Sequence, residues 1–89
     1  MSMRFPTHRE FERQAKKLSL GVQDKLWKRI ELLITDERNP LLNDHKLHHP
    51  FDGYSSINIT GDWRLVYKKL DAQTFYLRAV GTHHQLFGS

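Results

Sequence analysis

The fold is decided by the stretch Thr60-Gly61-Asp62-Trp63-Arg64-Leu65-Val66-Tyr67 of the 89-residue chain. Large apolar side chains recur at every second position from Trp63, which is the period of a β-strand, and Gly61 supplies a turn before it. On the other side of that turn, Ile57 and Ile59 alternate in the same way. The sequence therefore predicts two antiparallel strands joined near Gly61.

A third strand is predicted to follow, with one apolar face made of Phe75, Leu77 and Ala79. The segment Asp71-Ala72-Gln73 separates it from the strand before. If all three residues form the loop, Tyr67 lies opposite Leu77 and Leu65 lies opposite Ala79. This register places the apolar side chains of both strands on one face.

The same register brings Arg64 and Arg78 out together on the opposite face. Across the ladder, the two guanidinium groups would be close enough to share one anion. Because such cations need a partner, we expect a negatively charged ligand at this face.

Two amphipathic helices are predicted ahead of the strands. The first begins at Thr7, because Thr7-His8-Arg9-Glu10 has the form of a capping box. Gly21 interrupts the pattern, and a second helix then runs as far as Asn39-Pro40, joined to the first by a tight turn. The apolar positions recur at helical spacing: Phe11, Ala15 and Leu18 in the first helix, and Val22, Leu26, Ile30 and Leu33 in the second, widened by Trp27 and Ile34.

Residues 40–53 are predicted to be mainly loop, because they carry two prolines, a glycine and little periodicity. Residues 1–89 are predicted to form one α+β domain, an N-terminal helical hairpin packed on a small antiparallel β-sheet. The expected core consists of Leu65, Tyr67, Phe75 and Leu77 from the strands and Leu26, Ile30 and Leu33 from the second helix.

The composition limits the classes of function. The chain has no cysteine, which excludes disulfides and thiolate metal sites, and no apolar run long enough to span a bilayer. Residues 1–20 lack a signal-peptide core, so we expect a cytoplasmic protein with no membrane partner. The net charge is +4, and residues 1–38 hold nine basic and six acidic side chains. This basic half fits an anionic partner such as RNA or an acidic protein segment, or a solvated helix face.

The last third of the chain carries residues suited to a phosphodiester. Asp62 and His83 can move protons, and Arg64 can stabilise phosphoryl charge. The ring of Phe87 can stack on a base. Zinc is the alternative that the histidines raise, because His45-x-x-His48-His49 has a ligand-like spacing, but no cysteine or carboxylate completes a familiar motif. We therefore expect a site without a metal or other cofactor.

These residues resemble those of the RelE/ParE superfamily of bacterial toxins, most closely its YafQ-like mRNA interferases. The resemblance covers nearly the whole chain and rests on Asp44-His45-Lys46-Leu47, Gly53-Tyr54, the stretch 60–67, and Gly81-Thr82-His83-His84-Gln85-Leu86-Phe87-Gly88. It implies a RelE/ParE-like fold and a type II toxin, bound by a cognate antitoxin, that cuts mRNA on the ribosome. Cleavage would proceed through attack of the RNA 2′-OH, without a metal.

By position, the resemblance implies an active site made of His45, Asp62, Arg64, His83 and Phe87. Three further residues are expected to contact the substrate: Trp63, Lys68 and Arg78. Two positions depart from the family pattern, because Asn58 stands where a histidine is common and Ala79 stands where an arginine is common. An asparagine cannot carry a proton at neutral pH, which puts an acid–base role at position 58 in doubt.

Two other functions remain open for the same fold. One is a non-enzymatic toxin such as the gyrase-inhibiting ParE branch, and the other is a degenerate member that only binds an antitoxin. The clustered acid–base residues favour the nuclease, since inhibition of gyrase does not call for them. Asn58 keeps the degenerate alternative open.

Overall fold

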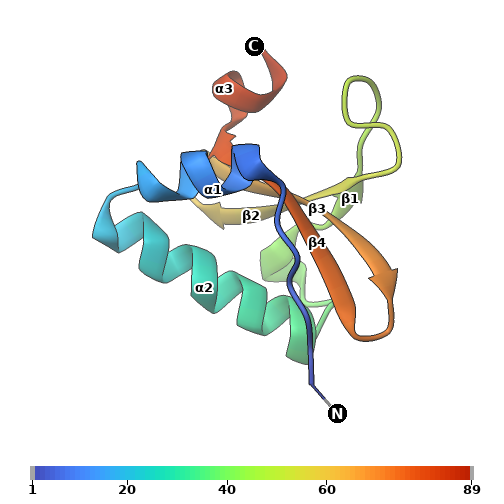
Figure 1. The fold of residues 1–89 in the computed structure, drawn as a ribbon. Coiled ribbons are helices and arrows are strands. Elements are labelled where there is room, and N and C mark those ends of the chain that lie inside the picture. The colour runs from blue at the N-terminus through green and yellow to red at the C-terminus, as the bar shows by residue number, and fades with distance from the viewer. Residues whose placement is uncertain (1, 89) are drawn as a thin grey trace.

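The computed structural model describes residues 2–88, which form a helical hairpin packed on an antiparallel sheet (Figure 1). The helices are α1 (Arg9–Lys16), α2 (Leu20–Thr35), the short 3-10 helix η1 (Pro40–Leu42) and α3 (His83–Phe87). The sheet has the order β1 (His45–Lys46), β2 (Ser55–Thr60), β3 (Trp63–Asp71) and β4 (Thr74–Thr82). The predicted α+β fold is therefore confirmed. None of the helices within residues 2–88 has the length and apolar character needed to cross a membrane.

The main core lies between the helices and one face of the sheet. All seven predicted core residues are buried there, each at most 5% exposed. Phe11 and Leu18 of the hairpin join them, which also confirms the apolar side of the first helix. The sequence predicts that Trp27 widens the buried stripe of α2, but Trp27 is 52% exposed. It lies at the flank of a stripe that Leu26, Ile30 and Leu33 already fill.

The predicted starts of both hairpin helices are wrong by one or two residues. His8, not Thr7, caps α1, because its Nδ1 accepts the hydrogen bond from the Glu10 N–H at 3.0 Å. Ser19 caps α2 through the Val22 N–H, so Gly21 lies inside the first turn of that helix. Residues 17–19 separate the two helices instead.

The register between β3 and β4 is confirmed at Tyr67, which lies opposite Leu77. It is wrong at Leu65, which lies opposite Val80, because a β-bulge inserts one extra residue in β4 between the partners of Tyr67 and Val66. The extra residue is Arg78. As a result, Leu77 and Val80 both join the main core, although they are three residues apart.

The opposite side of the sheet, here called the outer face, carries a second and smaller apolar cluster. Its buried members are Val66, Ala79 and Leu86, and α3 and the 47–54 loop supply the partly buried side chains around them. Ala79 therefore lies on the outer face and not, as predicted, with the apolar residues of the other face. Neither β1 nor α3 is among the predicted elements, although Thr82 and Gln85 form a capping box whose S/T-x-x-Q pattern is visible in the sequence.

Candidate functional site

The strand register places two rows of side chains across the outer face. One row consists of His45, Ser56, Val66 and Ala79, and the next consists of Asn58, Arg64 and Gly81. Neighbouring strands lie about 4.8 Å apart, so β1 is roughly 10 Å from β3. The predicted residues His45 and Arg64 thus share one face, at a separation that a bound ligand could bridge.

Arg64 is held in place at the β2–β3 turn. Its Nη1 donates to the carbonyl oxygens of Gly61 at 2.9 Å and Trp63 at 3.1 Å, and its Nη2 lies 3.9 Å from Asp62 Oδ1. The Arg64 side chain is only 18% exposed, whereas that of Asp62 is 62% exposed. A cation that is partly shielded from water attracts an anion more strongly than one on an open surface.

The start of α3 is tied to the same turn. The His83 N–H donates to the Asp62 carbonyl oxygen at 3.0 Å, and the exposed His83 ring meets the Phe87 ring edge-on, with the ring centres 4.9 Å apart. Phe87 in turn meets Phe51 of the 47–54 loop at 6.0 Å. The structure therefore brings four predicted residues, Asp62, Arg64, His83 and Phe87, to one end of the outer face.

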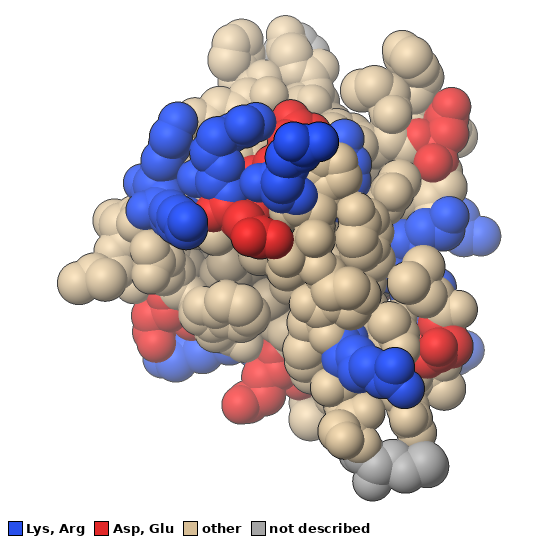
Figure 2. Space-filling model, viewed as in Figure 1, with Lys and Arg blue, Asp and Glu red and all other residues tan. Residues whose placement is uncertain are grey.

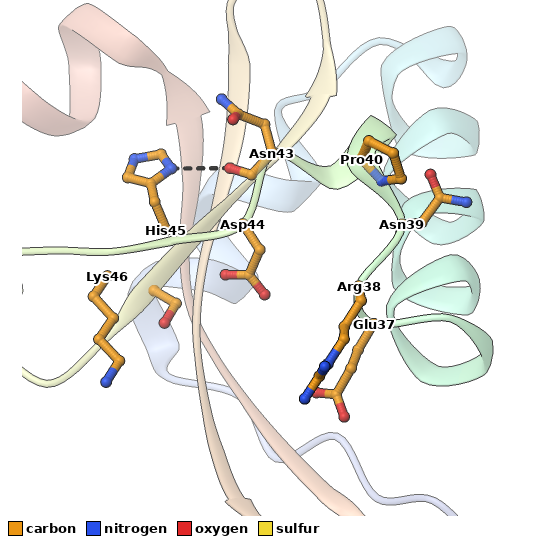
Figure 3. A pocket seen from close by; sticks show the side chains of 9 residues that line it. Glu37, Arg38, Asn39, Pro40, Asn43, Asp44, His45 and Lys46 are labelled. Atoms are coloured by element: carbon orange, nitrogen blue, oxygen red, sulfur yellow. Dashed lines mark hydrogen bonds between the residues drawn. The ribbon is translucent and has the colours of Figure 1, made fainter.

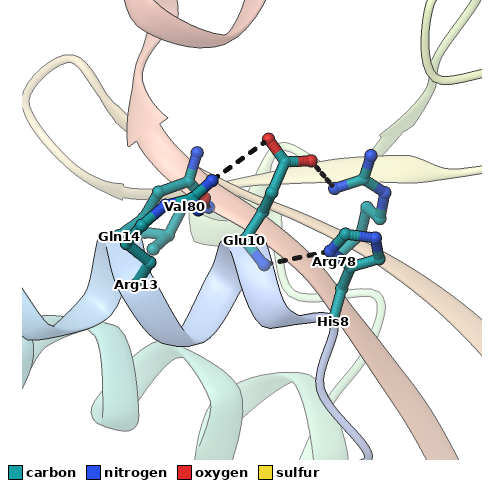
Figure 4. Close-up of polar contacts among 6 residues, drawn as sticks. All are labelled: His8, Glu10, Arg13, Gln14, Arg78 and Val80. Carbon is teal, nitrogen blue, oxygen red and sulfur yellow. Dashed lines mark hydrogen bonds and ion pairs between the residues drawn. The ribbon is translucent and has the colours of Figure 1, made fainter.

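Arg78 has a different partner from the one expected (Figure 4). Its Nη1 donates to Glu10 Oε1 of α1 at 2.8 Å, and its guanidinium carbon lies 5.6 Å from the centre of the Phe51 ring. The hydrogen bond from Arg78 holds the pKa of Glu10 below its ordinary value. The predicted pairing of Arg78 with Arg64 rested on the register that the bulge changes, since Arg64 lies opposite Gly81. No local sequence pattern points to Glu10 or Phe51 as neighbours of Arg78.

His45 is exposed on β1, at the edge of a hollow of about 770 Å³ (Figure 3). Its Nδ1 lies 2.9 Å from the backbone carbonyl oxygen of Asn43. The neighbouring Asp44 points to the other side of the chain and accepts a hydrogen bond from the Tyr67 hydroxyl. Burial, followed by this bond, raises the pKa of Tyr67.

The two remaining predicted contacts lie apart from this group, Trp63 at the same end of the sheet but on its other face and Lys68 further along β3. Trp63 is half-buried and packs against the main core, on the helix-facing side of the sheet. Lys68 lies on β3 four residues beyond Arg64, with its Nζ 5.6 Å from the centre of the Tyr54 ring. Neither residue joins the group around His83.

Two polar side-chain atoms of β2, Ser56 Oγ and Asn58 Oδ1, are buried without a hydrogen-bond partner in the described part of the chain. Over the same part of the chain, no three histidine or carboxylate side chains are grouped as metal ligands. The outer face therefore combines fixed positive charge at Arg64 with buried polar atoms that have no partner within residues 2–88.

Comparison with known proteins gives a family-level match. A family model described as the bacterial toxin of type II toxin–antitoxin system, YafQ, matches residues 3–88. YafQ from E. coli strain BL21(DE3) is 26% identical with a TM-score of 0.81, covering 98% of this chain and 100% of that chain. The crystal structure of the E. coli DinJ–YafQ toxin–antitoxin complex contains a chain that is 25% identical with a TM-score of 0.78. The match covers 99% of this chain and 100% of that chain. A search of curated proteins by sequence found no match.

Two other solved toxins are similar. A copper-bound mutant toxin from Helicobacter pylori is 26% identical with a TM-score of 0.79, covering 96% of this chain and 99% of that chain. The E. coli RelBE toxin–antitoxin complex is 17% identical with a TM-score of 0.67, covering 91% and 96%, and shows a shared fold. The fold expected from the resemblance is thereby confirmed.

Proposed function

The chain belongs to the YafQ family of bacterial toxins of type II toxin–antitoxin systems, and we propose that it is a ribosome-dependent mRNA endonuclease that inhibits translation. The observation that carries this proposal is the meeting of Asp62, Arg64, His83 and Phe87 at one end of the outer face. These residues supply a fixed cation, two proton-transfer groups and an aromatic ring. In RNA cleavage, the cation stabilises the transition state, the proton-transfer groups serve the attacking and leaving oxygens, and the ring positions a base.

The reaction that fits these residues uses the RNA as its own nucleophile. The 2′-oxygen attacks the adjacent phosphorus in line with the 5′-oxygen, which leaves. One proton is removed from the 2′-OH and one is given to the 5′-oxygen, so the products are a 2′,3′-cyclic phosphate and a 5′-OH. The transition state is dianionic, and Arg64 stabilises it because a guanidinium is always charged and can contact two oxygens at once.

Proton transfer is assigned to His83, with Asp62 or His45 as the second group. An exposed histidine can exchange protons near neutral pH, and His83 stands at the first position of α3, where its N–H donates to the Asp62 carbonyl oxygen. Phe87 stacks on the base of the cleaved nucleotide. The site is open without its substrate, because the ribosome presents the mRNA in its A site and completes the geometry.

Positive charge on α1 supports docking on the ribosome. Lys and Arg side chains gather over α1 on the face shown in Figure 2, and its exposed basic residues are Arg9, Arg13 and Lys16, followed by Lys17. Ribosomal RNA attracts such a cluster through its phosphates. This helix is therefore assigned to contact with ribosomal RNA.

The protein partner is assigned as an acidic antitoxin, as the DinJ–YafQ complex of the E. coli relative supports. The net charge of +4 favours an acidic, partly disordered segment that wraps the toxin. We expect its affinity to fall as salt is added, because exposed charges are screened. Titration calorimetry with the product of the adjacent small gene tests this, and a salt-independent complex, or no complex, would contradict it.

The proposed cleavage is tested by adding the purified protein to translating ribosomes and mapping the new 5′ ends of the mRNA. We expect cuts bearing 5′-OH only where the ribosomal A site is occupied by message. His83→Ala and Phe87→Ala should fold, bind the antitoxin and cleave at least about tenfold more slowly. Intact mRNA together with inhibited gyrase would point to the ParE-like function, and inactivity in both assays would point to a degenerate binding protein.

Independence from a metal needs its own control. The toxin is treated with a chelator and desalted, while the ribosomes keep their magnesium. We expect the parent cleavage rate, because the 2′-OH reaction requires no metal. A rate that falls on chelation and returns with added copper or zinc would contradict this part of the proposal.

A further inference from the structure

A hollow of about 300 Å³, here called the end pocket, lies where the last residues of β4 pass α1 and lead into α3 (Figure 1). Its floor is apolar, because Leu18 and Val80 belong to the main core. The half-buried indole of Trp63 lines one side of it. The polar residues that line the end pocket are Gln14 and Lys17 at the end of α1 and Gln85 of α3.

The two glutamines turn their donor groups away from the backbone. Gln14 Oε1 accepts a hydrogen bond from the Val80 N–H at 2.9 Å. In the same way, Gln85 Oε1 accepts from the Thr82 N–H at 2.9 Å. Because a backbone N–H can only donate, the free end of each amide is its NH₂ group. Within residues 2–88, neither NH₂ group donates to an acceptor, and neither does the indole N–H of Trp63.

The polar lining of the end pocket therefore consists of donors. Lys17 is exposed and adds a positive charge, and no carboxylate is among the described residues that line the pocket. A ligand that satisfies these groups must carry acceptors, a negative charge and a flat ring that can lie against Trp63. A nucleotide combines all three, since its base has ring nitrogens or carbonyl oxygens and its phosphate is an anion.

The end pocket adjoins the candidate active site around the end of the sheet. Trp63 stands between Asp62 and Arg64 in the chain, and its side chain lies on the other face because successive strand residues alternate. Gln85 follows His83 by two residues in α3. An RNA that is held at Arg64 can therefore reach the end pocket with a base next to the cleaved nucleotide. This placement favours RNA over a protein segment as the occupant.

We propose that the end pocket binds one unpaired base of RNA, guanine in preference to adenine, with Trp63 against the base and Lys17 on its phosphate. The inference rests on the proposed cleavage of mRNA. Guanine suits a lining of donors because its O6 and N7 are both acceptors, whereas adenine has a donor, its N6 amine, beside N7. The message supplies the nearer base, and the ribosomal RNA at α1 is the other source of the same chemistry.

The free toxin tests the pocket without any cleavage assay. The chain has two tryptophans, so the ¹⁵N-labelled protein gives two indole N–H signals, which Trp27→Phe assigns. Guanosine 5′-monophosphate should move the Trp63 signal to saturation and leave that of Trp27 in place. Adenosine 5′-monophosphate should bind at least about threefold more weakly. An unmoved Trp63 signal, or shifts confined to His83 and Phe87 of the outer face, would overturn the inference.

Two neighbouring lysines give a matched pair of variants for this titration. Both side chains are exposed at the end of α1, but only Lys17 lines the end pocket. Lys17→Ala should weaken binding of guanosine 5′-monophosphate at least about threefold, and Lys16→Ala should leave it near the parent value. Equal losses would mean general attraction by charge and would overturn the inference. A glutamate-rich peptide that moves the Trp63 signal where the nucleotide does not would assign the pocket to a protein partner instead.

Ribosome experiments then identify the source of the base. If the message supplies it, Lys17→Ala should bind message-free ribosomes like the parent but lose a preference for guanine beside the cut. If ribosomal RNA supplies it, the affinity for message-free ribosomes should fall and the preference should stay. No change in either measurement would overturn the role of the pocket. Nucleotide binding at Trp63 by a parent toxin that cuts no mRNA on ribosomes would contradict the proposed function alone.

Discussion

The two faces of the sheet differ in how completely their groups are satisfied. In the described part of the chain, the helix-facing side buries thirteen apolar residues in one cluster, while the outer face buries three. The outer face instead holds two partly exposed arginines and two buried polar atoms that lack a partner within residues 2–88. Apolar burial stabilises a fold, whereas a buried polar atom without a partner costs stability and a fixed charge gains from an oppositely charged ligand. On the proposed function, one face of the sheet stabilises the fold and the other face carries the chemistry.

The largest expected effect comes from Leu77→Ala, a change on the helix-facing side. Leu77 is fully buried in the main core, so the cavity left behind should lower the free energy of unfolding by about 2–5 kcal/mol. Urea denaturation measures this. If the helix-facing side contributes only to stability, the cleavage rate per folded molecule should stay near that of the parent. A cleavage rate that falls along with the stability would show that the two faces are not independent.

A change on the outer face should lower the cleavage rate much more than the free energy of unfolding. Arg64→Ala removes the cation that pairs with Asp62, and the cleavage rate should fall about 10²–10³-fold. Stability should change by only about 1 kcal/mol, because two hydrogen bonds to backbone carbonyls at a partly exposed site are lost. Single-turnover cleavage and urea denaturation give the two values. Arg64→Lys retains the charge without the forked geometry, so its cleavage rate should lie between those of the parent and of Arg64→Ala. If Arg64→Ala cleaved RNA at the parent rate, Arg64 would not belong to the active site.

Gly81 tests the attachment of α3 to the outer face. A Cβ at position 81 would lie 2.9 Å from Gln85 Oε1, the acceptor of the Thr82 N–H in the capping box. Gly81→Ala should therefore displace this cap, cost about 1 kcal/mol and speed hydrogen exchange in α3. Gly21→Ala is the matched control, since nothing lies within 4 Å of that position and alanine favours a helix. Equal effects from the two variants would mean that α3 is not packed as described.

The smallest effect is expected at the ion pair between Glu10 and Arg78. The bond from Arg78 lowers the pKa of Glu10, so it contributes stability above the ordinary glutamate pKa of about 4.3 and loses it as the pH falls below that value. Because the Glu10 side chain is 41% exposed, Glu10→Gln should cost less than about 1 kcal/mol near neutral pH. Urea midpoints across the acid range should converge for parent and variant. A difference that grows with acid would contradict this sign.

The parts of the fold that repeat along the chain could be predicted from the sequence. Leu26, Ile30 and Leu33 recur with the period of a helix, and Tyr67 and Leu77 belong to alternating strands, so their burial follows from local order. β1 could not be found this way, because two exposed residues show no alternation. α3 could have been found, since Thr82-x-x-Gln85 signals a helix start.

Contacts between distant segments explain what the sequence did not reveal about the site. Arg78 and Glu10 are 68 positions apart, and no local pattern links them. The left-handed conformation of Asn43 depends on the loop around it, which residue type alone does not determine. Asp62, Arg64, His83 and Phe87 were easier to group, because the turn and the strand end that carry them are adjacent in a simple antiparallel sheet.

The bulge in β4 affects how positions of this sequence should be aligned with those of its relatives. An alignment would score position 79 as the loss of an arginine, yet Arg78 lies over Phe51 on the same side of the sheet as Ala79. In a regular strand, a move of one residue would have carried that charge under the helices. The bulge therefore widens the set of sequences that evolution can use at this surface, because an arginine can change its position in the chain and keep its side of the sheet.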